Sequence, residues 1–193
     1  MSNAKAVLDR VLTVVLTAAL AAFLLVFFTN DGVFEWAFRR HQNTLSWVVR
    51  PLLILPFCFF AYRRSLNGML ATILAILTSM FWFPAPMEVD PRVAEFLAME
   101  RARLKAGFDL QNIAAIVFVA AFLVALAVAF WRRSLVWGGA VAVLGAVGKS
   151  AWSVLASPEG GSAVLPFAAA GVVALLVALV LASRFRKRSG RKD

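Results

Sequence analysis

The 193-residue chain is 62% hydrophobic and 16% charged, with a mean hydropathy of +0.84. A soluble domain is typically about half apolar and a quarter charged, so this composition excludes an ordinary soluble fold. One cysteine and one histidine exclude an intramolecular disulfide, a C-x-x-C motif and a multi-histidine metal site within one chain. The net charge of +10 is spread over the segments between apolar runs, which argues against nucleic acid as a partner.

The apolar residues are gathered in long runs with almost no charge. Runs of roughly 18 or more such residues cross the hydrocarbon layer as helices, because lipid cannot satisfy backbone polar groups. We therefore predict an all-α, polytopic membrane protein whose residues 1–193 form a single bundle. The six predicted spans are 11–28, 45–62, 66–83, 113–131, 135–156 and 165–183.

Lysine and arginine predict the orientation of this bundle. With the N-terminus inside, the inner segments carry 12 basic residues, whereas the outer loops, at about 29–44, 84–112 and 157–164, carry 6. The positive-inside rule then places both termini in the cytoplasm. A chain rich in alanine and arginine is typical of a bacterial plasma membrane protein.

A short sequence recurs at both predicted inner turns between spans. Arg63-Arg64-Ser65-Leu66 is repeated as Arg132-Arg133-Ser134-Leu135, each after an aromatic residue. Duplication of a helical hairpin would explain the recurrence. Alternatively, inner turns favour arginine pairs in any case.

The second outer loop, at about 84–112, contains a predicted amphipathic helix over 91–106. Asp90 is a suitable N-cap, Pro91 suits the first helical position, and Gly107 follows the end. Helical periodicity indicates an interfacial helix between the third and fourth spans. Its apolar stripe consists of Val93, Phe96, Leu97 and Leu104.

Glu100 lies in the middle of that stripe, whereas Glu95 is expected to point away from it. A carboxylate on an apolar face needs a partner. Arg101 and Arg103, at the edges of the stripe, are two candidates, and a helix that lies high in the interface would let either one pair with Glu100.

Two basic residues lie within predicted spans. Arg50 and Lys149 are both roughly 8–10 Å below the outer end of their spans, counted at 1.5 Å per residue. Ionisable residues in the membrane are candidates for function, although side chains this shallow can also extend to the headgroups. We predict an outward-facing binding site formed by Arg50, Lys149, Glu100 and Ser153. His41, in an outer loop, is expected to be an interfacial residue.

The fifth span carries small residues at helical spacing beside Lys149. Such rows allow close helix packing in membranes. The residues with this predicted packing role are Gly138, Ala142, Gly145, Ala146 and Ser150.

These features predict non-enzymatic binding or transport of an anionic solute or lipid headgroup, with membrane lipids as partners and no cofactor or metal. One alternative is an accessory subunit of a larger membrane complex, or a homo-oligomer, with the small-residue face as its interface. A second alternative is a lipid-modifying enzyme. Its catalytic or metal-binding carboxylates would be Glu88, Asp90, Glu95 and Glu100.

Overall fold

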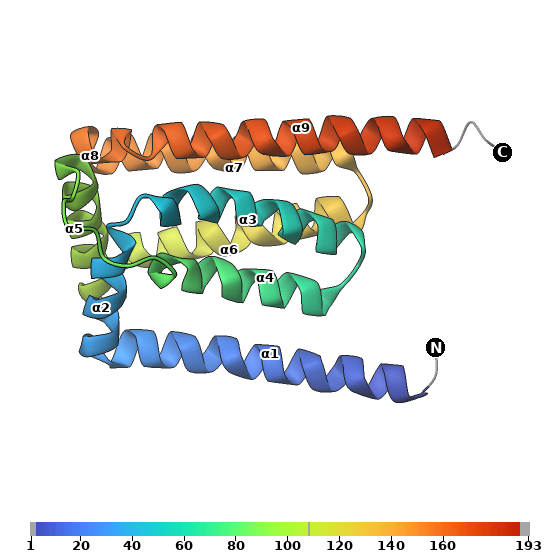
Figure 1. Cartoon of the computed structure of the whole chain (residues 1–193), viewed down its shortest axis with the longest axis horizontal. Coiled ribbons are helices and arrows are strands. Elements are labelled where there is room, and N and C mark those ends of the chain that lie inside the picture. Colours follow the sequence, from blue (N-terminus) through green and yellow to red (C-terminus); the bar gives the residue numbers. More distant parts are fainter. Residues whose placement is uncertain (1–2, 108, 190–193) are drawn as a thin grey trace. The chain divides into compact units, whose positions relative to one another are not determined.

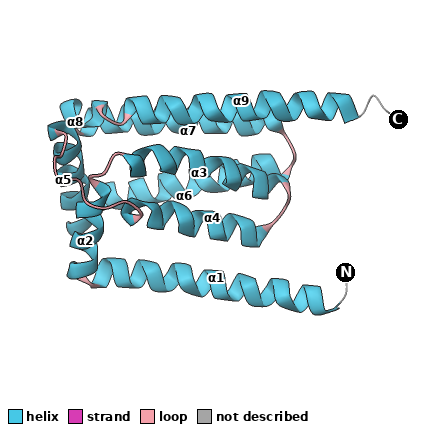
Figure 2. Ribbon diagram, in the orientation of Figure 1, coloured by secondary structure: helices cyan, strands magenta, loops and turns pink. Residues whose placement is uncertain are grey.

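The computed structural model describes residues 3–107 and 109–189, with side chains described as far as residue 185, and every regular element in these ranges is helical. The chain divides into two compact units, Met1–Met87 and Glu88–Asp193. Figure 1 shows the order of the helices, and Figure 2 shows that only short loops join them. Each unit contains long apolar helices and a shorter helix across one end.

In the first unit, α4 packs between α1 and α3. These helices run over Asn3–Thr29 (α1), Leu45–Tyr62 (α3) and Leu66–Thr78 (α4). A 3-10 turn, η1 (Ser79–Phe81), continues α4. The short helix α2 (Asp31–His41) lies across the end of the unit where α1 finishes and α3 begins (Figure 1).

The helix α2 lies within the segment 29–44, for which the sequence predicted an outer loop and no helix. Asn30 caps the helix, because its side chain accepts a hydrogen bond from the backbone amide of Val33 at 3.0 Å. The buried side chains of α2 recur at helical spacing and pack toward the unit. They are Phe34, Ala37, Phe38 and His41.

Within the described ranges, five helical segments are long and apolar enough to cross a membrane, which indicates an integral membrane protein. They include α1, α3, α6 (Leu110–Trp131) and α7 (Leu135–Ala156), and the fifth extends over Pro158–Phe185. The predicted third span, 66–83, corresponds to a shorter helical stretch, Leu66–Phe81. The all-helical class is therefore confirmed for the described residues, whereas the helical stretch at the predicted third span is shorter than expected.

In the second unit, α7 packs between α6 and α9 (Leu165–Ser189). The surface helix α5 (Pro91–Lys105) lies across one end of this unit and packs against the short helix α8 (Pro158–Ser162) (Figure 1). Asp90 caps α5 through its side chain, which accepts from the amide of Arg92 at 2.9 Å.

The apolar stripe of α5 is buried over its first three members. Val93, Phe96 and Leu97 are 2%, 4% and 3% exposed, whereas Leu104 is 39% exposed and does not belong to the buried face. The difference arises because α5 packs on α8 through its N-terminal half: a side chain added at Gly160 would meet backbone atoms of Arg92 and Phe96.

The small residues of α7 receive aromatic side chains of α6. Side chains added at Gly138 and Gly145 would overlap the rings of Phe130 and Phe122, respectively. Ala142, between them, is buried. This face of α7 is therefore covered within its own unit, as close packing at small residues requires.

The turns that contain Arg63-Arg64 and Arg132-Arg133, which we call the arginine turns, have the same backbone structure. In each, the second arginine is left-handed, with φ of 57° at Arg64 and 59° at Arg133. Ser65 and Ser134 each donate their backbone amide to the carbonyl five residues earlier, at 2.9 and 3.2 Å. Each serine then caps the next helix. The sequence recurrence is thus a recurrence of structure.

Candidate functional site

Two of the predicted site residues, Glu100 and Lys149, lie in the second unit and form an ion pair. Lys149 of α7 lies with its Nζ atom 3.2 Å from Oε1 of Glu100 on α5. The same amine is 5.4 Å from the centre of the Phe96 ring, one helical turn earlier on α5. The two side chains are 49% and 29% exposed, so the pair lies at the surface of the unit. The structure therefore gives Glu100 a partner that is neither Arg101 nor Arg103.

Arg103 completes this cluster, one turn beyond Glu100. Its guanidinium carbon lies 4.9 Å from the centre of the Trp152 ring, and Trp152 is one turn beyond Lys149 on α7. The Nη1 atom of Arg103 is buried and has no hydrogen-bond partner among the described residues. A buried guanidinium N–H without an acceptor is destabilising, and an aromatic face attracts the charge but accepts no strong hydrogen bond.

From the sequence, Arg103 was considered only as a partner for Glu100. The contact between Arg103 and Trp152 could have been predicted from residue spacing, because Glu100 and Arg103 are three residues apart on α5, just as Lys149 and Trp152 are on α7. Residues three apart share a helix face, so one contact between the helices predicts the second. We refer to Phe96, Glu100, Arg103, Lys149 and Trp152 as the α5–α7 cluster.

Glu95, expected to point away from the apolar stripe, is exposed and contacts the end of α7. Its Oε1 atom accepts a hydrogen bond of 2.5 Å from the hydroxyl of Ser157, which ends α7. This contact fixes α5 against α7 beside the α5–α7 cluster. Glu95 therefore positions α5 and leaves Glu100 as the carboxylate that faces Lys149.

Ser153, predicted to line the site, is fully buried where α8 returns over α7. Its Oγ atom has no hydrogen-bond partner in the described part of the chain. A side chain added at Gly161 of α8 would overlap the Ser153 carbonyl, so the two backbones are in close contact. Ser153 thus lies beneath α8, whereas Lys149 is exposed.

Arg50 belongs to the first unit and takes part in a polar network there. Its Nη1 atom is 3.0 Å from Nε2 of His41, and its Nε donates to Oγ of Ser79 at 3.4 Å. His41 Nδ1 lies 2.8 Å from the hydroxyl of Ser46, which itself donates to the carbonyl of Asn43. His41 therefore carries its proton on Nδ1 and accepts from Arg50 at Nε2.

His41 was expected at the interface, but it is buried, with 4% of its surface exposed. Burial, followed by the charge of Arg50, lowers the pKa of His41 from 6.5 to about 2. The imidazole is therefore neutral at physiological pH. A shared site of Arg50 with Lys149 and Glu100 stays a prediction.

The α5–α7 cluster is rich in charged side chains. It combines two cations with one carboxylate: the ammonium group of Lys149 is exposed, and the Arg103 guanidinium lies over the Trp152 ring with its Nη1 atom buried. Among the described residues, no three His, Cys, Asp or Glu side chains gather where they could hold a metal ion.

Comparison with protein-family models, with curated proteins and with solved structures finds no match to this chain.

Proposed function

We propose that the protein is a small, non-enzymatic membrane protein that binds or transports an anionic solute or lipid headgroup at the α5–α7 cluster. The observation that carries this proposal is the buried Nη1 atom of Arg103, which has no acceptor within the described chain. An anionic oxygen would satisfy this donor and gain a charge-assisted hydrogen bond.

Charge balance supports an anion as the ligand. Glu100 neutralises one of the two cations of the cluster, because it is paired with Lys149. Arg103 stacks on Trp152, which orients its planar guanidinium. A phosphate or carboxylate could therefore bind Arg103 and contact the exposed amine of Lys149 without displacing Glu100.

The membrane arrangement that we propose has six spans, with both termini in the cytoplasm. It requires α4 to cross the membrane together with η1. These elements contain 13 and 3 residues, which gives about 25 Å of helix. A span slightly shorter than the ~30 Å layer is accommodated by local thinning and by interfacial aromatic residues such as Trp82. The cluster then faces outward, in what we propose is a bacterial plasma membrane.

A binding measurement with three variants tests the site. The full chain, in nanodiscs of phosphatidylcholine, is titrated separately with short-chain phosphatidylglycerol and with inorganic phosphate. Arg103→Gln should weaken binding about tenfold or more, because it removes a charge-assisted hydrogen bond. Lys149→Met should also weaken it. Arg101→Gln is the matched control, since it removes the same charge from an exposed position on the same helix.

The two probes distinguish the sources of the anion. Saturable binding of phosphatidylglycerol alone identifies a lipid headgroup, whereas binding of inorganic phosphate identifies a soluble anion. Equal affinities of Arg103→Gln and the unmodified protein, or an equal loss in Arg101→Gln, would show that the cluster is not the site.

The two alternatives predicted from the sequence receive less support. Glycines of the small-residue face of α7 contact α6 and α9 within the unit, so that face offers little surface for a larger complex. Of the four outer carboxylates, Asp90 pairs with Arg92, Glu95 with Ser157 and Glu100 with Lys149.

A further inference from the structure

The two arginine turns lie at the end of each unit that is opposite its surface helix. In the first unit, the turn between α3 and α4 is far from α2, and in the second unit the turn between α6 and α7 is far from α5 (Figure 1). Each turn therefore marks the end of its own unit's long helices that lies away from the surface helix of that unit. The four arginines of the turns are exposed. They are Arg63, Arg64, Arg132 and Arg133.

Arg64 and Arg133 occupy positions that favour glycine. The left-handed conformation crowds the Cβ atom of an L-residue, and helices that end in this way usually have glycine there. Within the described ranges, these two arginines are the non-glycine residues with positive φ. At the end of α5 the same chain places Gly107, with φ of 84°. Arginine at both turns is thus unfavourable for the backbone, which points to a role for its side chain.

The backbone amides of both turns are used within the protein. The amides of Arg63, Arg64 and Ser65 all donate to carbonyls of α3, and the amides of Arg132, Arg133 and Ser134 donate in the same pattern to α6. An anion at either turn would therefore be held by guanidinium groups. Two adjacent guanidiniums match the oxygens of a phosphate.

We propose that each arginine turn binds the phosphate of an anionic phospholipid, at the end of its unit's long helices that is opposite the unit's surface helix. The partner is a lipid because the turns join helices that are long and apolar enough to span, or nearly span, the membrane. Tyr62 and Trp131 immediately precede the two arginine pairs, and such residues are enriched at the headgroup level. Basic residues at this level are attracted to anionic lipids. This inference does not depend on the function proposed for the α5–α7 cluster.

The experiment counts bound lipids by native mass spectrometry of the full chain. All proteins carry Arg103→Gln, so that the α5–α7 cluster does not contribute. The parent should bind phosphatidylglycerol more tightly than phosphatidylcholine. Arg64→Asn with Arg133→Asn should reduce the affinity for phosphatidylglycerol about fivefold for each site. Asparagine tolerates the left-handed conformation, so the backbone of both turns is retained.

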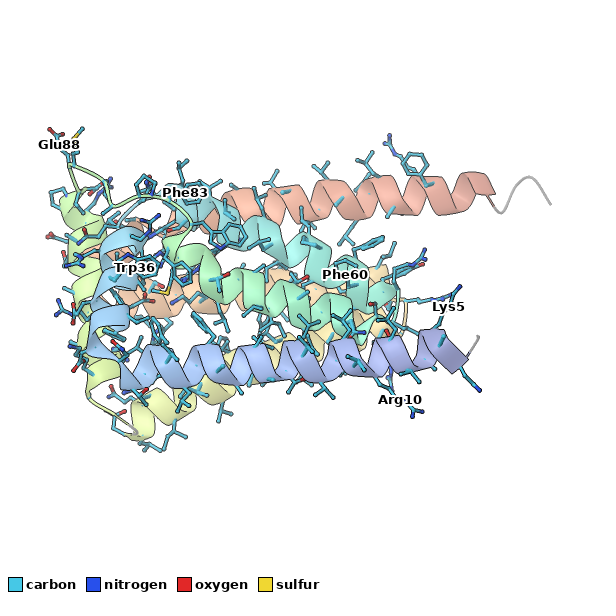
Figure 3. All side chains as sticks on the ribbon, turned by 60° about the horizontal axis from the view of Figure 1, so that its bottom comes forward. Lys5, Arg10, Trp36, Phe60, Phe83 and Glu88 are labelled. Carbon is cyan, nitrogen blue, oxygen red and sulfur yellow. The ribbon has the colours of Figure 1, made fainter. Side chains whose placement is uncertain are left out.

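Two further variants separate lipid binding from charge and from folding. Lys5→Asn with Arg10→Asn removes the same charge from the N-terminal end of α1, where both side chains extend outward (Figure 3), and should leave the affinity unchanged. Arg64→Gly with Arg133→Gly removes the unfavourable left-handed conformation of a non-glycine residue, so the melting temperature should not fall. Its affinity for phosphatidylglycerol should nevertheless be reduced as much as that of the asparagine variant.

Three results would overturn the proposal. The first is unchanged affinity for phosphatidylglycerol in the glycine variant. The second is an equal loss in the variant of Lys5 and Arg10, which would indicate general attraction to charge. The third is displacement of the lipid by excess inorganic phosphate, which would assign the turns to a soluble anion.

Discussion

Nε2 of His41 accepts a hydrogen bond from Nη1 of Arg50 at 3.0 Å, and this contact joins α2 to α3. A second proton on His41 would occupy the atom that receives this bond and would face a guanidinium. The contact therefore exists only while the imidazole is neutral. It also depends on α2, which brings the histidine over the end of α3.

The first prediction is that His41 makes the first unit less stable in acid. Its folded pKa of about 2 lies below the unfolded value of 6.5, so the unfolded state binds more protons between these values. Stability is full above pH 6.5 and falls by about 1.4 kcal/mol per unit below it. Between pH 7.5 and 4.5, the free energy of unfolding should fall less for His41→Gln than for the unmodified protein. A difference between the two proteins that does not change with pH would contradict this assignment.

The second prediction concerns a polar contact between α1 and α4. Nδ2 of Asn67 donates to Oδ1 of Asp9 at 2.6 Å, and Oδ1 of Asn67 accepts from Thr13 at 2.7 Å. Asn67→Leu should lower the free energy of unfolding by about 1–2 kcal/mol, because hydrogen bonds between helices stabilise membrane bundles by this amount. Thr17→Val is the control, since the hydroxyl of Thr17 bonds only within α1. Equal losses in both variants would show that the contact is not specific.

The third prediction tests the close packing of α6 on α7. A side chain at Gly145 would overlap the ring of Phe122. Gly145→Val should therefore destabilise the protein by about 1–3 kcal/mol, as overpacking does. Ala140→Val adds volume at an exposed position of the same helix and should be close to neutral. Thermal unfolding in detergent compares the two, and a neutral Gly145→Val would show that the ring can move aside freely.

The sequence predicts those parts of the fold that depend on local pattern. The N-cap Asp90 and Pro91 correctly indicate where α5 begins, and helical phase places Glu100 on the side that faces Lys149. By contrast, the segment 29–44 was predicted only as a loop, and α2 was missed. Local propensity at that position is weak, and the burial of Phe34 and Phe38 against the unit stabilises the helix.

The parts of the candidate site that could not be predicted depend on contacts between distant elements. Glu95 was judged by its phase relative to the apolar stripe, yet Ser157 approaches from the side because α8 packs closely on α5. Similarly, Arg103 lies at the edge of the stripe, and its contact with Trp152 follows from where α7 lies beside α5. The helical phase gives the direction in which a side chain points, whereas the tertiary packing determines which residues it contacts.

The fourth prediction is that α4 crosses the membrane. The background is Cys58→Ala, since Cys58 is the single cysteine. With six spans, Met87→Cys and Glu159→Cys should react with an impermeant reagent from outside, and Arg63→Cys only after permeabilisation; all three positions are exposed. If α4 returns without crossing, Met87→Cys and Arg63→Cys would instead react from the same side.

The last prediction separates the two effects of Glu100 at the α5–α7 cluster. Glu100 pairs with Lys149, so Glu100→Gln removes the carboxylate and leaves two cations, Lys149 and Arg103, on one surface. The pair is partly exposed, so its loss should lower the free energy of unfolding by less than about 1 kcal/mol. The affinity for an anion should rise, because a negative charge near the ligand has been removed.

Lys149→Met removes the cation of the same ion pair, whereas Glu100→Gln removes the anion. The substitute is apolar and of similar length, so it should preserve contact with Phe96 while weakening anion binding. Both variants are titrated with phosphatidylglycerol at two salt concentrations. The affinity of Glu100→Gln should be higher than that of the unmodified protein and the affinity of Lys149→Met lower, and both differences should be smaller at high salt. If Glu100→Gln weakens binding as Lys149→Met does, then Glu100 contacts the ligand or holds the site in shape, and the cluster does not act as a simple balance of charges.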